Sequence, residues 1–72
     1  MIHRDLIAKS FNEAKSKIKK NIFVAKYNWD SMTIINLITN IDKKFKKNID
    51  YKKFAKIKTF GDLDKLIQKT LK

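Results

Sequence analysis

The serine with the most specific chemical setting is Ser31, which lies between Asp30 and Met32. The Asp30 carboxylate can accept a hydrogen bond from a free backbone N–H, so Asp30 is predicted to cap a helix that begins at Ser31. In that first turn, unpaired N–H groups and the positive end of the helix dipole favour a phosphate, and a phosphodiester on the Ser31 hydroxyl would be well placed. The triplet contains no His or Lys to activate this hydroxyl, so a separate enzyme would have to provide the base.

Other residues that could do chemistry are scarce. His3 is the only histidine, and the chain has no cysteine, so zinc sites of the usual ligands and catalytic triads have no candidates. A chain of 72 residues also buries only ~60% of its unfolded surface, which leaves little interior for a closed active site. We therefore predict no catalytic residue, no metal site and a protein that is not an enzyme.

The helix that would position Ser31 is the clearest element of the sequence. Residues 31–46 carry apolar side chains on one face at helical spacing, which are Ile34, Leu37, Ile38, Ile41 and Phe45. Trp29, just before the cap, is placed as the outer half of a hydrophobic staple. The opposite, outward face carries Met32, Asn36, Thr39 and Lys43, with Ile35 on the boundary. An apolar Met on this face has no packing role, although scattered surface apolar residues are common.

Three further helices are predicted. Ile7, Phe11, Ala14 and Ile18 share one helical face, which predicts a helix over 4–19. Asp50 is placed to cap a short helix over 51–56, and a capping pattern at 59–62 precedes an amphipathic helix over 60–71. The spacing of the first helix also reaches Ile22 and Ala25, which would let that helix continue, but the mix of β-branched, aromatic and Asn residues over 21–28 favours a loop there. With no proline and one glycine, the sequence predicts an all-α fold, a four-helix bundle with a short third helix, formed by residues 1–72 as one domain.

The charge of the chain is strongly basic. Eighteen Lys and Arg residues against seven Asp and Glu give a formal net charge of +11, so a small helical module that binds nucleic acid is the alternative function. Only one of these residues, Arg4, is an arginine, and Tyr27 and Tyr51 form no evident stacking platform. We therefore expect no specific nucleic-acid recognition.

The longest apolar run, 22–25, is far too short for a membrane span or a signal peptide. The sequence therefore predicts a cytoplasmic protein without a membrane span.

The triplet Asp30-Ser31-Met32 and the residues that follow it resemble the acyl carrier protein family. The resemblance covers residues 29–67, with the family's apolar spacing kept without insertion or deletion; it includes Ile34, Leu37, Ile38, Ile41, Phe45, Ile49 and then Lys56-Ile57-Lys58-Thr59. Trp before Asp-Ser, together with Thr59-Phe60-Gly61-Asp62-Leu63, is most similar to stand-alone carriers of polysaccharide or glycoconjugate pathways. The alternative for Ser31 is an ordinary polar residue at a helix N-terminus.

The resemblance implies a carrier whose Ser31 holds a covalent 4′-phosphopantetheine arm installed by a phosphopantetheinyl transferase. The thiol of the arm would hold an acyl group as a thioester for a specialised lipid, polyketide or glycoconjugate pathway, and the apolar interior between the second and third helices could shelter the acyl chain. Asp30 would serve as helix cap and motif residue. Partner enzymes would dock on the second helix, at Met32, Ile35, Asn36, Thr39, Lys43 and Lys47.

The sequence departs from the family in the sign of its charge, because family members are usually acidic along the second helix and the following loop. Here residues 31–58 contain Asp42 and Asp50 against eight lysines. Like charges across an interface lower affinity and slow encounter, which argues against the common fatty-acid biosynthesis enzymes as partners. We expect a monomer whose acyl-loading and acyl-transfer enzymes present acidic docking surfaces. The lysines also have a simpler explanation in solubility and helix stabilisation.

Overall fold

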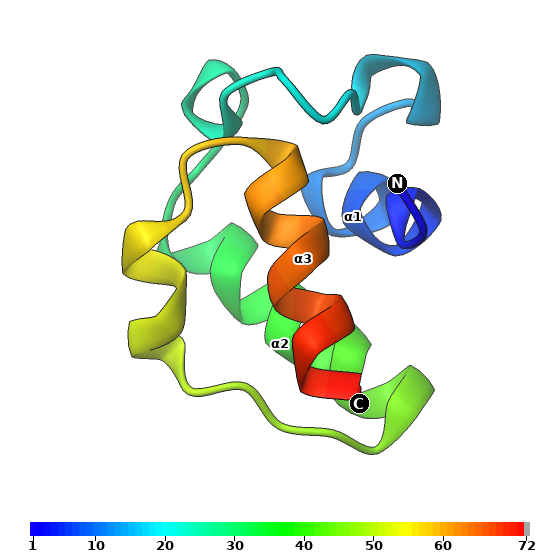
Figure 1. Ribbon diagram of the computed structural model, residues 1–72, viewed down its shortest axis with the longest axis vertical. Helices are drawn as coiled ribbons and strands as arrows, with labels where there is room; N and C mark the ends of the chain where they lie inside the picture. Colours follow the sequence, from blue (N-terminus) through cyan, green and yellow to red (C-terminus); the bar gives the residue numbers. More distant parts are fainter. Residues whose placement is uncertain (72) are drawn as a thin grey trace.

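A computed structural model describes the fold of residues 1–71 (Figure 1). Three α-helices are present, α1 (Arg4–Phe11), α2 (Ser31–Phe45) and α3 (Phe60–Leu71), together with three 3-10 segments, η1 (Lys15–Lys17), η2 (Val24–Lys26) and η3 (Tyr51–Lys56). Residues 1–71 form no β-strand, and Phe23 and Thr59 make one isolated antiparallel bridge. The prediction of an all-α fold is confirmed. The short third helix is a 3-10 segment, so the structure has three α-helices where four helices were expected.

The first helix is shorter than predicted. α1 ends at Phe11 because Asn12 adopts a left-handed backbone conformation, with φ of 57°. The N–H groups of Asn12 and Glu13 then donate to the carbonyls of Lys9 and Ala8, at 3.2 and 3.0 Å, which is the Schellman pattern of a helix end. The prediction of one helix over 4–19 is therefore wrong. Ile18 is nevertheless fully buried, because the chain brings it back to the core through η1.

The second helix follows the prediction closely. Its inward face buries Ile34, Leu37 and Ile41, while Ile38 and Phe45 are partly buried against the same core. α2 ends at Phe45 because Lys46 is left-handed, with φ of 58°, and its N–H donates to the Asp42 carbonyl at 2.8 Å. Beyond this residue the chain leaves the helix axis and runs through residues 47–50 to η3 (Figure 1).

The predicted capping pattern at the start of α3 is confirmed. The Asp62 N–H donates to the Thr59 hydroxyl oxygen at 3.1 Å, and the Thr59 N–H donates to the Asp62 carboxylate at 3.1 Å. The Lys58 N–H donates to the same carboxylate at 3.2 Å. These backbone hydrogen bonds from Thr59 and Lys58 lower the pKa of Asp62. The helix then buries Leu63 and Ile67 in the core.

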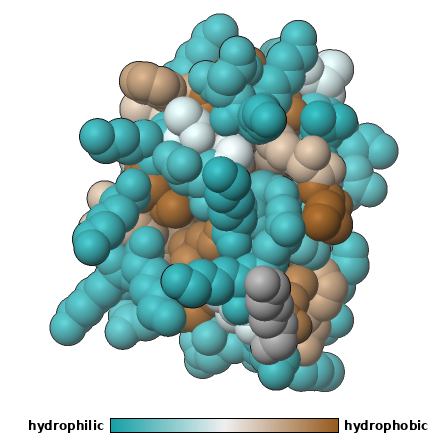
Figure 2. Space-filling view, in the orientation of Figure 1, coloured by the Kyte–Doolittle hydropathy of each residue, from teal (hydrophilic) through white to brown (hydrophobic). Residues whose placement is uncertain are grey.

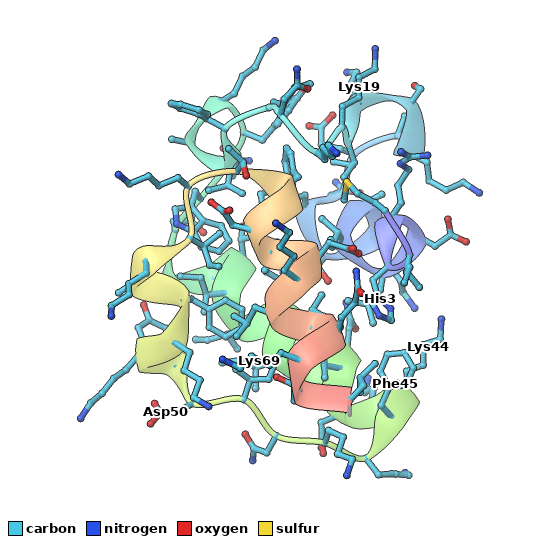
Figure 3. All side chains as sticks on the ribbon, viewed as in Figure 1. His3, Lys19, Lys44, Phe45, Asp50 and Lys69 are labelled. Atoms are coloured by element: carbon cyan, nitrogen blue, oxygen red, sulfur yellow. The ribbon has the colours of Figure 1, made fainter. Side chains whose placement is uncertain are left out.

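Aromatic side chains join the elements around one core. The Phe11 ring meets Phe60 edge-on at 5.1 Å and stacks with Trp29 at 5.8 Å between ring centroids. Trp29 also lies 6.3 Å from the ring of Phe54, which is fully buried. At the other end, His3 meets the edge of Phe45 at 5.6 Å, where Figure 3 shows the two rings together. Residues from α1, α2, η3 and α3 thus share one hydrophobic cluster.

The long connection between α1 and α2 is held against the start of α3 by three backbone hydrogen bonds. The Val24 N–H donates to the Lys58 carbonyl at 2.9 Å, and the Phe60 N–H donates to the Ile22 carbonyl at 3.0 Å. The third runs from the Gly61 N–H to the Lys20 carbonyl at 2.9 Å, and a Cβ at Gly61 would lie 2.9 Å from the same oxygen. The predicted loop at 21–28 therefore has a fixed path, with η2 inside it.

A buried carboxylate ties the beginning of the chain to α3. Asp64 accepts hydrogen bonds from the N–H groups of His3 at 2.7 Å and Ile2 at 3.3 Å, and from the Gln68 side-chain amide. Burial raises the pKa of Asp64, but the bonds from His3, Gln68 and Ile2 outweigh burial, so the net shift of this pKa is downward. The negative charge is thus stabilised inside the fold, at the N-terminal end of α1.

Candidate functional site

Ser31 lies at the first position of α2 with an exposed side chain. Asp30 caps the helix as predicted, because its carboxylate accepts a hydrogen bond from the Thr33 N–H at 3.0 Å. The N–H groups of Ser31 and Met32 precede this bond and have no carbonyl one turn earlier in the helix. The exposed hydroxyl therefore stands beside free donors and the positive end of a 15-residue helix, a setting that suits a phosphate.

Tyr51 reaches this hydroxyl from the neighbouring element. Its phenolic O–H donates to the Ser31 side-chain oxygen at 3.2 Å, so the first residue of η3 lies over the start of α2. The Tyr51 side chain is 48% exposed, and the contact is open to solvent. The sequence alone indicates no role for Tyr51 at this site. The two residues lie twenty positions apart in different elements, and no local spacing pattern indicates their contact.

The outward face of α2 continues from Ser31. Met32 and Ile35 are 66% and 50% exposed, and they follow Ser31 by one and four positions in the helix. Asn36, Thr39 and Lys43 are exposed further along the helix. Together these five residues present an exposed face that starts with two apolar side chains and ends with a cation. The structure thus places five of the six residues expected to dock partner enzymes on one helix face.

The sixth residue, Lys47, lies outside this helix face. The left-handed Lys46 ends α2 two residues earlier than Lys47, so Lys47 does not follow Lys43 by one helical turn. The sequence predicted both lysines as docking residues of the second helix, and the left-handed Lys46 is the physical reason for the difference. Lys47 is exposed and contributes charge near the end of α2 without sharing its face.

The charge around the site is positive and unpaired. Within residues 1–71, ion pairs join Lys15 to Asp5 and Lys17 to Glu13, and none involves a lysine of α2 or η3. Lys44 lies over the Phe45 ring, with 5.4 Å between the ammonium nitrogen and the ring centroid. The lysines of α2 and η3 therefore contribute their field to the surroundings with little internal compensation.

The expected shelter for an acyl chain is closed in this structure. Leu37 and Ile41 of α2 and Phe54 of η3 are all fully buried in the same hydrophobic cluster. Side chains therefore fill the interior that was expected to shelter the acyl group. An acyl chain could enter only if these side chains moved apart.

None of the helices formed by residues 1–71 has the length and apolar character that crossing a membrane requires.

The arrangement provides an exposed hydroxyl at a helix N-terminus, with an apolar and then basic face next to it. It contains no base in contact with the Ser31 hydroxyl among the hydrogen bonds of residues 1–71, because Tyr51 acts as a donor to it. The sequence matches no protein-family model, and neither a curated protein nor a solved structure matches it.

Proposed function

We propose that this chain is an acyl carrier protein that holds its cargo on a 4′-phosphopantetheine arm attached to Ser31. The observation that carries the proposal is the exposed Ser31 hydroxyl at the first position of a long helix capped by Asp30. The resemblance of the triplet and of the apolar spacing after it to carrier proteins adds to this observation. The proposal includes an acyl-carrier-like arrangement of the helices, in which η3 takes the place of the short third helix.

Attachment of the arm would proceed by phosphoryl transfer from coenzyme A. The Ser31 oxygen attacks the phosphorus that bears the pantetheine, a new O–P bond forms, and the bond from that phosphorus to the adenosine 3′,5′-bisphosphate leaving group breaks. The hydroxyl proton passes to a base of the transferase. The free N–H groups of the first turn and the O–H of Tyr51, which contacts the Ser31 oxygen, would be the donors available to the new phosphodiester.

Partner enzymes would meet the exposed face of α2 next to the arm. Met32 and Ile35 offer apolar contact area, and Lys43 adds positive charge further along. Because the lysines of α2 and η3 form no ion pair within the described residues, the surface favours acyl-loading and acyl-transfer enzymes with carboxylates around the arm entrance. A monomeric carrier in the cytoplasm, serving a specialised lipid, polyketide or glycoconjugate pathway, is part of this proposal.

The experiment that tests the attachment site is mass measurement after incubation with coenzyme A and a broad-specificity phosphopantetheinyl transferase. Wild type should gain one phosphopantetheine, and Ser31→Ala should gain none because the nucleophilic oxygen is absent. Ser16→Ala is the matched control, since Ser16 is also exposed and lies in η1. This variant should be labelled as completely as wild type.

Two results would contradict the proposal. If wild type gains no mass while a known carrier in the same reaction does, Ser31 is an ordinary residue at a helix start. If Ser31→Ala is labelled as fully as wild type, the arm is attached elsewhere. Circular dichroism of each variant should show unchanged helix content, because the side chain of Ser31 is exposed.

A further inference from the structure

A groove with four lysines lies between η3 and α3, and Ser31 is not among the residues that line it. Its volume is about 540 Å³. We call it the lysine groove, and its lining residues are Lys52, Lys53, Lys56, Leu66, Lys69 and Thr70. Figure 2 shows the corresponding hollow in the face of the molecule, where apolar atoms are visible between hydrophilic side chains over η3 and α3.

The two walls of the lysine groove come from two successive elements, η3 and α3. The six-residue 3-10 segment η3 supplies three lysines. α3 supplies Leu66, Lys69 and Thr70, which share one face because they are three and four positions apart. In Figure 3, Lys69 projects from α3 toward the side of the molecule on which η3 lies. The fold therefore gathers four lysine side chains around one hollow.

The floor of the groove differs in character from its walls. Leu66 is half-buried and apolar, and the Thr70 hydroxyl donates to the Leu66 carbonyl at 2.9 Å, so its proton is already engaged. The groove therefore offers a ligand positive charge from the walls and apolar contact from the floor, with the lysine ammonium groups as its charged donors.

The charges of the groove have no acidic partner among residues 1–71. Neither ion pair of the described chain involves a groove lysine. Asp50, next to η3, directs a carboxylate oxygen to the backbone N–H of Lys52 at 3.0 Å and does not line the groove. Four like charges on the walls of one hollow repel each other, and an anion of high charge density relieves this repulsion.

We propose that the lysine groove binds a compact oligophosphate anion, either inorganic triphosphate or the triphosphate chain of a nucleotide. Several closely spaced phosphates match several ammonium groups better than a single carboxylate does, and lysine binds phosphate as a point charge. The volume falls in the range of small-molecule sites, about 300–1,000 Å³. Leu66 provides an apolar surface for a nucleoside if the phosphates belong to one.

This site is independent of the proposed carrier function. Tyr51 contacts Ser31, whereas the three lysines that follow in η3 line the groove, so the two sites lie on one short segment but use different residues. An oligophosphate can bind whether or not Ser31 carries an arm, and the experiment below uses the unmodified protein.

The test is isothermal titration calorimetry at about 0.15 M salt, where the Debye length is ~8 Å, with inorganic triphosphate, ATP and adenosine as probes. The groove variant Lys53→Gln with Lys69→Gln is compared with the control variant Lys19→Gln with Lys26→Gln. Both variants remove two positive charges, and the control residues are exposed lysines outside the groove. Circular dichroism checks the helix content of both.

Wild type should bind triphosphate and ATP with one site and should not bind adenosine. The groove variant should lose roughly tenfold or more in affinity, whereas the control variant should stay within about threefold of wild type. ATP binding tighter than triphosphate would identify a nucleotide as the ligand, and equal affinities would identify the phosphate chain alone; both support the site. Backbone amide shifts on titration should concentrate at residues 52–56 and 66–70.

Equal losses in both variants would overturn the proposal, because the binding would then follow net charge and not the groove. Absence of triphosphate binding to wild type would overturn it as well. A single-stranded oligonucleotide provides the last comparison: if it binds at this salt concentration far more tightly than triphosphate, and equally to both variants, the basic surface serves nucleic acid and the small-ligand site is wrong.

Discussion

At the scale of single residues, Asp64 connects the two ends of the described chain. Among residues 1–71 it is one of three buried polar side chains, with Ser10 and Thr33, and it is the charged one of these. Its carboxylate accepts hydrogen bonds from the N–H groups of Ile2 and His3, just before α1. The side chain of His3, the N-cap residue of α1, makes no capping hydrogen bond. Asp64 therefore stabilises the start of one helix from the side of another.

The stability of the fold should depend on the charge of Asp64. Asp64→Asn is expected to lower the free energy of unfolding at pH 7 by about 1–3 kcal/mol, because hydrogen bonds to a buried charge are lost or weakened. Asp42→Asn is the control, since it makes the same charge change at an exposed carboxylate, and it should have a much smaller effect. Urea unfolding of the three proteins measures the difference.

The effect of Asp64 should also fade in acid. The folded protein lowers the pKa of Asp64 below its unfolded value of about 3.9, so the unfolded chain binds more protons between the two pKa values. The stabilisation is therefore fully present above the unfolded pKa and is lost as pH falls through the folded pKa. The gap between wild type and Asp64→Asn should shrink as the pH is lowered from 5 to about 2. A gap that is independent of pH would contradict a role for the charge.

The sequence predicted some of these residue contacts and missed others. The Asp30 cap and the pairing of Thr59 with Asp62 were predicted because each partner lies three residues away. Asp64 and its bonds were missed because the donors lie 61 and 62 residues away in sequence. Its position next to Leu63 gave no sign of burial. Tyr51 was missed for the same physical reason, since its contact with Ser31 depends on how two elements pack.

At the scale of elements, the start of α3 depends on a glycine for packing and not for an unusual backbone conformation. Gly61 lies inside the first turn of α3 and does not have a positive φ. Its importance is the close approach of the Lys20 carbonyl, which accepts the Gly61 N–H at 2.9 Å. The contact lets the long connection between α1 and α2 lie directly on the helix.

Gly61→Ala tests whether packing or helix propensity decides stability here. Propensity favours Ala over Gly in a helix by about 1 kcal/mol. A Cβ would lie 2.9 Å from the Lys20 backbone oxygen, however, so the connection must shift, and we expect a net loss of about 1–2 kcal/mol. Thermal unfolding of Gly61→Ala and of the exposed control Lys65→Ala measures both effects. A higher melting temperature for Gly61→Ala would show that the connection yields without cost.

Helix boundaries illustrate what periodicity can and cannot predict. α2 and α3 match their predicted ranges because apolar spacing and end signals agree. The predicted first helix is too long because Ile18 keeps the helical spacing of the residues before it. In the structure the helix ends before the left-handed Asn12, and Ile18 is buried in the core from outside the helix. Arg4 holds that returning chain, because its side-chain Nε donates to the Ile18 carbonyl at 2.9 Å. The left-handed backbone of Asn12 ends the helix although the apolar spacing continues to Ile18.

At the scale of the whole molecule, the formal net charge of +11 acts against compactness. Only two ion pairs are present within residues 1–71, and both lie at the surface. Each joins a lysine of η1 to an acidic residue: Lys15 pairs with Asp5 of α1, and Lys17 pairs with Glu13, which follows α1. Surface pairs of this kind contribute little to stability. The apolar core must therefore hold together a surface whose lysines repel one another.

Added salt should stabilise this protein. Raising the ionic strength from about 0.01 M to about 0.15 M shortens the Debye length from ~30 Å to ~8 Å, which screens repulsion between separated lysines. The melting temperature in sodium chloride is expected to rise by several degrees, since about 1 kcal/mol corresponds to roughly 4–8 °C for a domain of this size. A melting temperature that falls with salt would show that favourable ion pairs outweigh the repulsion.

The stacking of Trp29 on Phe11 gives the molecule a built-in optical reporter. Trp29 is the only tryptophan in the chain, it is partly buried, and it lies two residues before Ser31. Its ring touches the end of α1 through Phe11 and faces η3 through Phe54. The fluorescence of this single tryptophan should therefore change when α1, η3 or the start of α2 moves relative to its ring. Such a measurement needs no attached dye.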